Sequence, residues 1–302
     1  MPIIYDEQNK IFNLQTPNTS YVIGLFKGKV PIHIHYGNRI ERTYKIEDMY
    51  DKTFSEVGLT IHNGDDFDVM DEVMPEEFPV YGSGYFGTPA FHAQYEDGSS
   101  VSRLYYSGHK IYEGKPQLKG LPSAYTDSDS EAQTLELYLQ DELTGVKIVM
   151  CYTAYNDRDV ITRSHKVING GSGNVRLKNI MSGFLSMPDK EYDFISLEGD
   201  WCHEGNVQRI PLIKGSCCVD SKRGTSSHTH NPFVCLASKG ATEEYGSVYA
   251  MNLVYSGNFV SGVFTDRYNS ARLYTGINPF DFEWLLESGG VSNSGMCNGI
   301  FG

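Results

Sequence analysis

Acidic side chains are the first groups in this 302-residue sequence that could carry out chemistry. The run DDFDVMDEVMPEEF, residues 65–78, is dense in aspartate and glutamate. Two carboxyl groups on either side of a glycosidic bond suffice to hydrolyse it, one as the acid and one as the nucleophile or base. The chain has 38 acidic residues, however, so spacing alone selects no pair. A solvated acidic loop is the favoured interpretation of this run.

Histidine pairs are the next candidates. His33/His35 and His228/His230 each have the His-x-His spacing that puts two imidazoles on one face of a strand. Protein zinc sites take three or four ligands, and no third ligand motif stands beside either pair. P-loop and GxSxG motifs are absent from the sequence as well. We therefore expect no metal and no cofactor, and these motifs indicate no catalytic residue.

The second histidine pair belongs to the polar stretch SSHTHNPF, residues 226–233. A contact between His228, His230 or Asn231 and a substrate is one interpretation. The favoured one is a hydrogen-bonded turn, with Asn231-Pro232 as the turn signal.

Charge and cysteine usage narrow the class of protein. The net charge of -13, without any run of lysine or arginine, argues against nucleic acid or an anionic membrane as the main partner. No apolar stretch approaches the roughly 20 residues that span a bilayer, and the N-terminus MPIIYDEQNK lacks the pattern of a secretory signal. The six cysteines form no CxxC pair and are expected to be reduced thiols. We therefore expect a cytoplasmic protein.

Alternating patterns predict the elements that must position any site. In TLELYLQDE, residues 134–142, Leu135, Leu137 and Leu139 alternate with polar neighbours, which is the period of a half-buried strand. A short loop containing Gly145 joins this run to VKIVMCYTAY, residues 146–155, so the two are predicted to form a hairpin.

Short apolar and aromatic runs continue to the end of the chain without intervening helical periodicity. They are VITRSHKVIN (160–169), VRLKNIMSGFLSM (175–187), SVYAMNLVYSG (247–257), NFVSGVFTDRY (258–268) and SARLYTGI (270–277). Strands at this spacing predict an all-β fold, here one large antiparallel β-sandwich with one or two short helices. Residues 1–287 are expected to form a single domain. The 21 tyrosines, whose rings can stack on sugars, favour a carbohydrate ligand.

Several segments together resemble the N-terminal domain of the family 36 glycoside hydrolases, the microbial α-galactosidases. They are SYVIGLFKGKVPIHIHYGNRI (20–40), PEEFPVYGSGYFGTPAF (75–91), HKIYEGKPQLKGLPSAY (109–125), ITRSHKVIN (161–169), RGTSSHTHNPFVCL (223–236), LVYSGNF (253–259) and GINPFDFEW (276–284). The resemblance implies a β-supersandwich, similar to galactose mutarotase, packed against a (β/α)₈ catalytic barrel. It also implies hydrolysis of terminal α-galactosides, of the raffinose and melibiose type, by a retaining mechanism.

In that family the barrel carries both catalytic aspartates, one of them in a Lys-Trp-Asp type motif. The two tryptophans here are Trp201, followed by cysteine, and Trp284, followed by leucine. No βα repeat that could form a barrel is visible either. The resemblance therefore implies that no catalytic residue lies in this chain and that the chain alone is inactive.

The resemblance also suggests substrate-binding residues, since the N-terminal domain of a neighbouring subunit helps to wall the pocket in this family. Trp201, in LEGDWCHEGNVQRIP, matches a family tryptophan that could stack on galactose. A core position is the alternative, but the polar flanks favour a loop. Asp71 or Glu72 matches a family aspartate. Where the family has Gly-Asp-Phe-Arg, residues 84–87 read Gly-Tyr-Phe-Gly, which puts a substrate role there in doubt.

The expected partners are α-galactosides in the full-length context and either a second copy of the chain or a barrel domain. Two alternatives remain open. One is a stand-alone carbohydrate-binding or assembly module. The other is a mutarotase-like enzyme, which would need a histidine and a glutamate facing one pocket as acid and base.

The final stretch, residues 288–302, is rich in glycine, serine and asparagine. It is expected to be an irregular tail at the point where the family leads into the catalytic domain.

Overall fold

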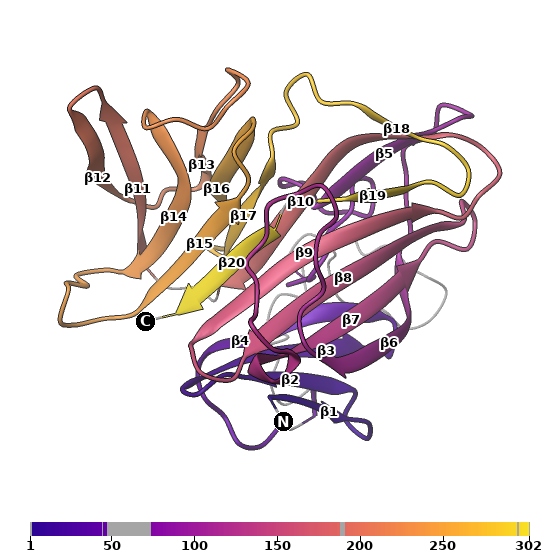
Figure 1. Cartoon of the computed structure of the whole chain (residues 1–302), viewed down its shortest axis with the longest axis horizontal. Helices are drawn as coiled ribbons and strands as arrows, with labels where there is room; N and C mark the ends of the chain where they lie inside the picture. Colours follow the sequence, from indigo (N-terminus) through magenta and orange to yellow (C-terminus); the bar gives the residue numbers. More distant parts are fainter. Residues whose placement is uncertain (1, 44, 47–73, 188–190, 295, 302) are drawn as a thin grey trace.

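The described residues form three antiparallel sheets (Figure 1). The computed structural model describes residues 2–43, 45–46, 74–187, 191–294 and 296–301. The first sheet has the order β1-β2-β3-β4 and lies at the bottom of Figure 1. Its strands are β1 Ile3–Asp6, β2 Ile11–Gln15, β3 Thr19–Phe26 and β4 Val30–Asn38.

The largest sheet has ten strands in the order β12-β11-β14-β15-β20-β9-β8-β7-β6, with β19 paired to β9. These strands are β6 Tyr105–Glu113, β7 Ala132–Gln140, β8 Val146–Tyr155, β9 Val160–Asn169, β11 Tyr192–Asp200, β12 His203–Pro211, β14 His230–Ser238, β15 Val248–Val254, β19 Val291–Asn293 and β20 Met296–Phe301.

The third sheet has six strands in the order β13-β16-β17-β10-β18, with β5 also paired to β10. These strands are β5 Phe91–Tyr95, β10 Val175–Met187, β13 Gly215–Asp220, β16 Phe259–Thr265, β17 Ala271–Ile277 and β18 Trp284–Leu286. A three-residue 3-10 helix, η1 Asp129–Glu131, precedes β7. The all-β fold class is confirmed.

The hairpin predicted from the leucine alternation is confirmed as β7 and β8. Leu135, Leu137 and Leu139 are buried, and Leu137 lies opposite Met150. The connecting turn is held by Asp141, whose Oδ1 accepts a hydrogen bond from the Leu143 amide at 2.9 Å. The strands predicted at residues 160–169 and 175–187 are β9 and β10.

The prediction of an irregular tail after residue 287 is wrong for the described residues there. β19 pairs with β9, and β20 lies between β15 and β9 and pairs with both. Backbone hydrogen bonds on both edges hold β20 in the sheet, so glycine and asparagine are tolerated where a strand pattern would call for larger side chains.

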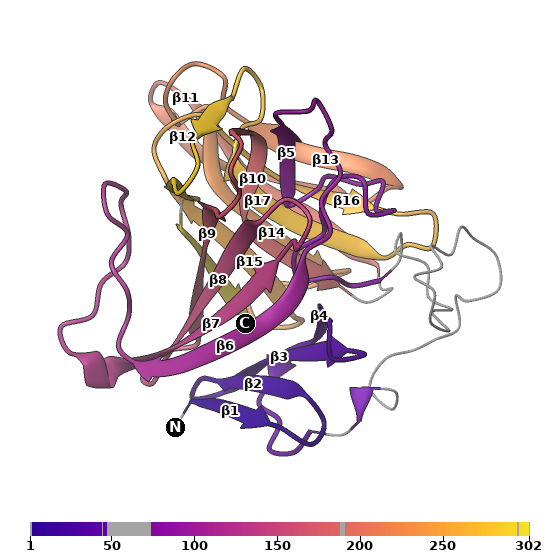
Figure 2. The same ribbon diagram turned by 90° about the vertical axis from the view of Figure 1, so that its right-hand side faces the viewer.

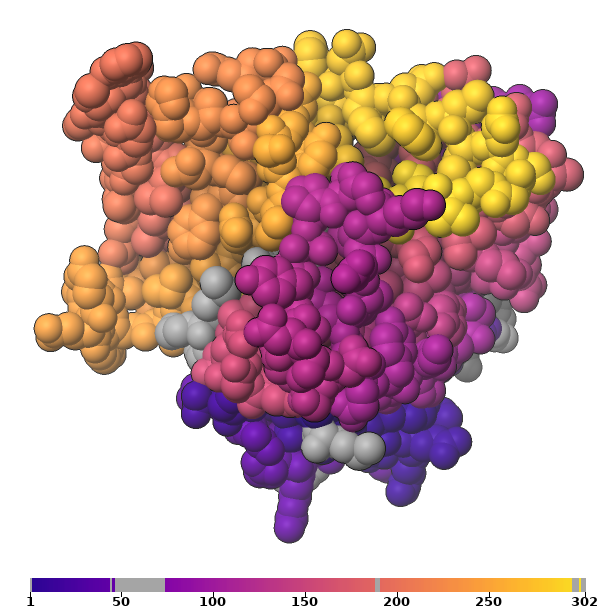
Figure 3. Space-filling view, viewed as in Figure 1, coloured from indigo at the N-terminus to yellow at the C-terminus, as the bar shows by residue number. Residues whose placement is uncertain are grey.

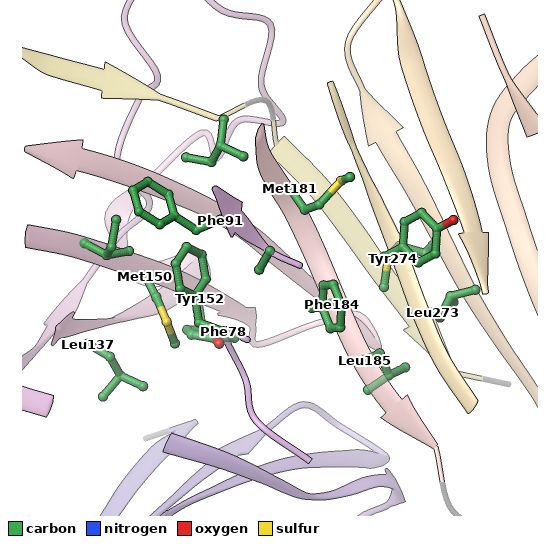
Figure 4. Packing of buried hydrophobic residues seen from close by; sticks show 14 of the residues in the cluster. Phe78, Phe91, Leu137, Met150, Tyr152, Met181, Phe184, Leu185, Leu273 and Tyr274 are labelled. Carbon is green, nitrogen blue, oxygen red and sulfur yellow. The ribbon is translucent and has the colours of Figure 1, made fainter. Parts of the chain in front are cut away.

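The main core lies between the three sheets (Figure 4). Leu137, Met150 and Tyr152 come from the ten-stranded sheet, and Phe184 and Leu273 come from the six-stranded sheet. The N-terminal sheet contributes alternate residues of β3 and β2 to the same core: Phe12, Leu14, Tyr21, Ile23 and Leu25. The three sheets therefore share one hydrophobic interior.

The opposite face of the N-terminal sheet is buried as well. Val22 and Phe26 of β3 pack in a second cluster with Ile32, Ile46 and Met74. This explains why every residue of β3 is buried.

Two segments project from this body. The β11–β12 hairpin stands out at the upper left of Figure 1, and the residues of β12 are exposed at nearly every position. The connection between β6 and β7, residues 114–131, extends away from the sheets in Figure 2 and forms a magenta ridge in front of them in Figure 3. Among the described residues, no helix has the length and hydrophobicity of a membrane-spanning segment.

Candidate functional site

Trp201 lies in the tight turn that joins β11 to β12, and 82% of its surface is exposed. Its backbone N–H donates to Asp200 Oδ1 at 2.7 Å, and the Cys202 N–H donates to Glu204 Oε1 at 3.1 Å. Cys202 has a left-handed φ of 58°, which the sharp reversal of the chain requires. The interpretation of Trp201 as a core residue is therefore wrong, and the loop position is confirmed. Its contact with substrate stays a prediction.

A second turn, at residues 227–230, packs against the base of this hairpin tip. The Gly199 N–H donates to the Thr229 carbonyl at 3.2 Å, and Glu198 pairs with His230. A Cβ at Gly199 would lie 2.6 Å from the Glu204 Cα and 3.0 Å from the His228 carbonyl oxygen, so only glycine fits there. The tip that carries Trp201 is held against residues 227–230 and is not a free loop end.

One histidine of that second turn, His230, has a structural partner. Thr229 donates its N–H to Ser227 Oγ at 3.2 Å, and His230 Nδ1 donates to the Asp220 carbonyl at 3.2 Å. The predicted hydrogen-bonded turn is confirmed, but its position is not. Asn231 and Pro232 belong to β14, because the chain reverses earlier, at His228 and Thr229.

The other two predicted substrate-binding residues, Asp71 and Glu72, lie outside the described residues. The Gly-Tyr-Phe-Gly stretch, in contrast, is described. Tyr85 is buried, with the Arg272 guanidinium 4.3 Å from its ring centre, whereas Phe86 is 69% exposed. The tyrosine that stands where the family has aspartate therefore packs in the interior and does not face solvent.

The acidic run of residues 65–78 ends in a buried carboxylate, so the expectation of a solvated loop is wrong for Glu77. Its side chain is fully buried and accepts hydrogen bonds from the Tyr21 hydroxyl at 2.7 Å and the Tyr152 hydroxyl at 2.6 Å. His33 Nδ1 lies 3.1 Å away, and Arg163 forms an ion pair at 2.9 Å. Residues from β3, β4, β8 and β9 thus converge on one carboxylate.

The charge of Glu77 is stabilised where it is. Burial alone would raise the pKa of this carboxyl, but the Arg163 guanidinium and the hydrogen bonds from His33 and Tyr152 outweigh burial and hold the pKa at about 2. A fully satisfied, ionised carboxylate away from solvent is a structural element rather than a general base.

The cluster continues through Arg163 to His165, two positions along β9. Arg163 Nε donates to His165 Nε2 at 3.1 Å, and His165 Nδ1 donates to the Met181 carbonyl at 2.6 Å. Burial and the Arg163 charge lower the pKa of His165 to about 3, so the imidazole is neutral. Sequence reasoning missed Arg163 and His165. The signal that could have found them is their spacing, because two polar side chains at i and i+2 lie on the same face of a strand, here a buried one.

A small cavity of about 30 Å³ lies beside Tyr21, Tyr152 and Arg163. This volume holds about one or two water molecules and is too small for a sugar ring. The buried pair of His33 and Glu77 therefore does not face a substrate pocket of the kind that a mutarotase-like acid and base would need. No group of three or more potential metal ligands is found in the described part of the chain.

The model of the glycosyl hydrolase family 36 N-terminal domain matches residues 29–287. The alpha-galactosidase AgaA of Geobacillus stearothermophilus is 40% identical over 302 residues, covering 96% of this chain and 39% of that enzyme. The bifunctional alpha-galactosidase/sucrose kinase AgaSK of Mediterraneibacter gnavus is 36% identical, covering 96% of this chain and 31% of that protein.

Solved structures agree with this assignment. The family 36 α-galactosidase AgaB from Geobacillus stearothermophilus superposes with a TM-score of 0.94 at 38% identity, covering 100% of this chain and 41% of that one. A variant of AgaA in complex with raffinose has a TM-score of 0.91 at 37% identity, covering 97% and 40%. This chain spans less than half the length of these relatives. By sequence and by fold, it belongs to the family of glycosyl hydrolase family 36 N-terminal domains.

Proposed function

We propose that this chain serves as the non-catalytic N-terminal β-domain of an α-galactosidase. The observation that carries the proposal is the match of residues 29–287 to a domain whose relatives are named α-galactosidases and are more than twice as long. In such an enzyme a separate barrel would supply the two carboxyl groups of the retaining mechanism. The isolated chain is then expected to release no product from a chromogenic α-galactoside, and measurable turnover would contradict the proposal.

Within that enzyme, the role proposed for the β11–β12 hairpin is to wall the substrate pocket of a neighbouring barrel. Trp201 supports this because it presents most of its indole to solvent from a braced turn. An indole face packs on the apolar side of a galactose ring, and its N–H can donate to a hydroxyl. Raffinose and stachyose are bound by variants of the related AgaA, and α-galactosides of this type are the proposed ligands here.

A chimera tests this role. The N-terminal part of Geobacillus AgaA is replaced by this chain, and kcat/KM for raffinose is measured with and without Trp201→Ala. Loss of one stacking contact is expected to lower kcat/KM about tenfold, mainly through KM. Tyr245→Ala is the matched control, because Tyr245 is similarly exposed at 78% but lies in the β14–β15 connection. Equal kinetics for the parent chimera and Trp201→Ala would refute the role.

Further proposals concern fold, assembly and location. The ten-stranded and six-stranded sheets are proposed to form the β-supersandwich of this family, which is supported by their shared core. One domain is proposed for residues 1–287 together with β19 and β20. It is proposed to assemble with a second copy or a barrel domain in the cytoplasm. The five cysteines whose side chains the structure describes are free, which supports a reducing compartment. A stand-alone carbohydrate-binding module remains the alternative.

A further inference from the structure

A polar hollow lies between two turns at the end of the six-stranded sheet. One turn follows β5, and the other joins β9 to β10. The hollow has a volume of about 290 Å³, which is the lower end of the range for small-molecule sites. Its lining residues are Gln94, Tyr95, Glu96, Gly98, Asn174 and Arg176. In Figure 1, β5 lies at the upper right, across the width of the molecule from the β11–β12 hairpin.

Contacts outside the hollow hold two of the side chains that line it, Tyr95 and Arg176. The Tyr95 hydroxyl is hydrogen-bonded to Ser102 Oγ at 2.5 Å, and the Arg176 guanidinium donates to Glu283 Oε1 at 2.5 Å. Glu96 lies against the β9–β10 turn, where a Cβ at Gly173 would come within 2.5 Å of its carboxylate oxygen. Side chains that are held in this way lose little freedom when a ligand binds.

The β9–β10 turn is also held by hydrogen bonds from the buried Asn169. The Asn169 side-chain amide donates to the Gly173 carbonyl at 2.8 Å and to the Leu286 carbonyl at 3.0 Å. Asn169 is itself fully buried at the end of β9. The wall of the hollow that carries Asn174 therefore rests on the core of the sheet.

The chemistry of the lining points to a neutral ligand with many hydroxyl groups. The Arg176 guanidinium is already paired with Glu283 and so attracts an anion little, and the Glu96 carboxylate repels one. No group of three or more potential metal ligands is found among the described residues, which disfavours a metal cation. The amides of Gln94 and Asn174 each offer a donor and an acceptor, and the structure gives them no hydrogen bond within the described chain. Adjacent sugar hydroxyls both donate and accept, and planar amide, carboxylate and guanidinium groups match this pattern.

We propose that this hollow binds one hexose unit, in a site separate from Trp201. The Tyr95 ring provides the apolar wall, and Gln94, Glu96, Asn174 and Arg176 provide the polar contacts. The site lies wholly within this chain and needs no barrel domain. Its existence is therefore independent of the function proposed above.

Titration of the isolated full chain with methyl α-D-galactoside, followed by NMR and calorimetry, tests the site. Binding with a millimolar dissociation constant is expected. Arg176→Ala should weaken it roughly tenfold or more, and Gln94→Ala by roughly two- to tenfold, as expected for lost charged and neutral hydrogen bonds. Gln208→Ala, which removes an exposed glutamine on β12, is the matched control and should leave binding unchanged.

Trp201→Ala distinguishes this site from the proposed pocket wall, since it should not affect binding to the isolated chain. The proposal is overturned by any of three results: absence of binding at 100 mM sugar, equal affinity in parent, Gln94→Ala and Arg176→Ala, or loss of binding in Trp201→Ala alone. Inorganic phosphate serves as a competitor. Displacement of the sugar by millimolar phosphate would identify an anion site instead and would also overturn the proposal. Unfolding midpoints of the variants show whether each one is folded.

Discussion

Replacing Glu77 by glutamine should destabilise this domain more than any surface change. The carboxylate is fully buried, and the amide would turn an N–H₂ group toward donors that now find an acceptor: Tyr21, Tyr152 and Arg163. Removing one partner of a buried ion pair costs about 3–5 kcal/mol, because the other charge stays buried without compensation. We expect the free energy of unfolding to fall by that amount for Glu77→Gln.

The pKa of Glu77 gives a related quantity, the preference of this site for the ionised over the protonated carboxyl. A pKa lowered from 4.5 to about 2 corresponds to about 3 kcal/mol of preferential stabilisation of the charged form. Because the folded-state pKa lies below the unfolded-state value, this contribution is fully present above pH 4.5. It is lost as the pH falls toward 2. The glutamine variant should lack this part of the acid dependence.

Urea unfolding followed by circular dichroism measures the effect. The matched control is Glu283→Gln, because Glu283 is also paired with two cations, Arg176 and Lys178, but is 42% exposed. Exposed pairs contribute about 0–1 kcal/mol. A double variant, Glu77→Gln with Arg163→Met, should lose less than the sum of the two single changes. If Glu77→Gln lies within 1 kcal/mol of the parent, the cluster does not hold the sheets together as argued.

Because the pKa of buried His165 is lowered to about 3, the unfolded chain takes up a proton below pH 6.5 while the folded protein does not. This residue alone should therefore lower the free energy of unfolding by about 1.4 kcal/mol per pH unit between pH 6 and 4. Burial also lowers the pKa values of His35, His92 and His109, which add to the slope. His165→Asn should reduce the slope by the contribution of one proton, and an unchanged slope in that variant would contradict the assignment. In the projecting connection between β6 and β7, brief trypsin treatment should cut first after exposed Lys119, because Lys115 precedes proline. Mass spectrometry identifies the fragments. Lys119→Gln should abolish this early cut, and first cleavage elsewhere would show that the connection is protected.

The strands with regular alternation could be predicted from the sequence because burial on one face has a period of two. Leu135, Leu137 and Leu139 show this pattern and are buried as expected. β20 could not be predicted in this way. Its place depends on the backbone edges of β9 and β15, which come from distant parts of the chain. Local composition, rich in glycine and asparagine, contains no information about those edges.

In the candidate site, too, features set by local sequence could be predicted, and features set by distant residues could not. The exposed turn at Trp201 could be predicted from its polar flanks, since turn chemistry is local. The burial of Glu77 could not, because the run that contains it is as rich in acidic residues as a surface loop. Its four partners, Tyr21, His33, Tyr152 and Arg163, lie 44 to 86 positions away. Only the assembled sheets bring them together.

The folding unit must extend beyond the residues that match the family model. A fragment of residues 29–287 would lack β1–β3 and with them Phe12, Leu14, Tyr21, Ile23 and Leu25, which are buried in the main core. Such side chains contribute about 1.5–3 kcal/mol each, and their sum is comparable to the whole net stability of a domain, about 5–15 kcal/mol. The fragment would also lose Tyr21 from Glu77 and would open the sheet where β20 joins β15 to β9. We therefore expect residues 29–287 to be unfolded or aggregated, whereas a fragment of residues 2–301 should unfold like the full chain. A cooperative unfolding transition of the shorter fragment would show that the N-terminal sheet is an accessory layer.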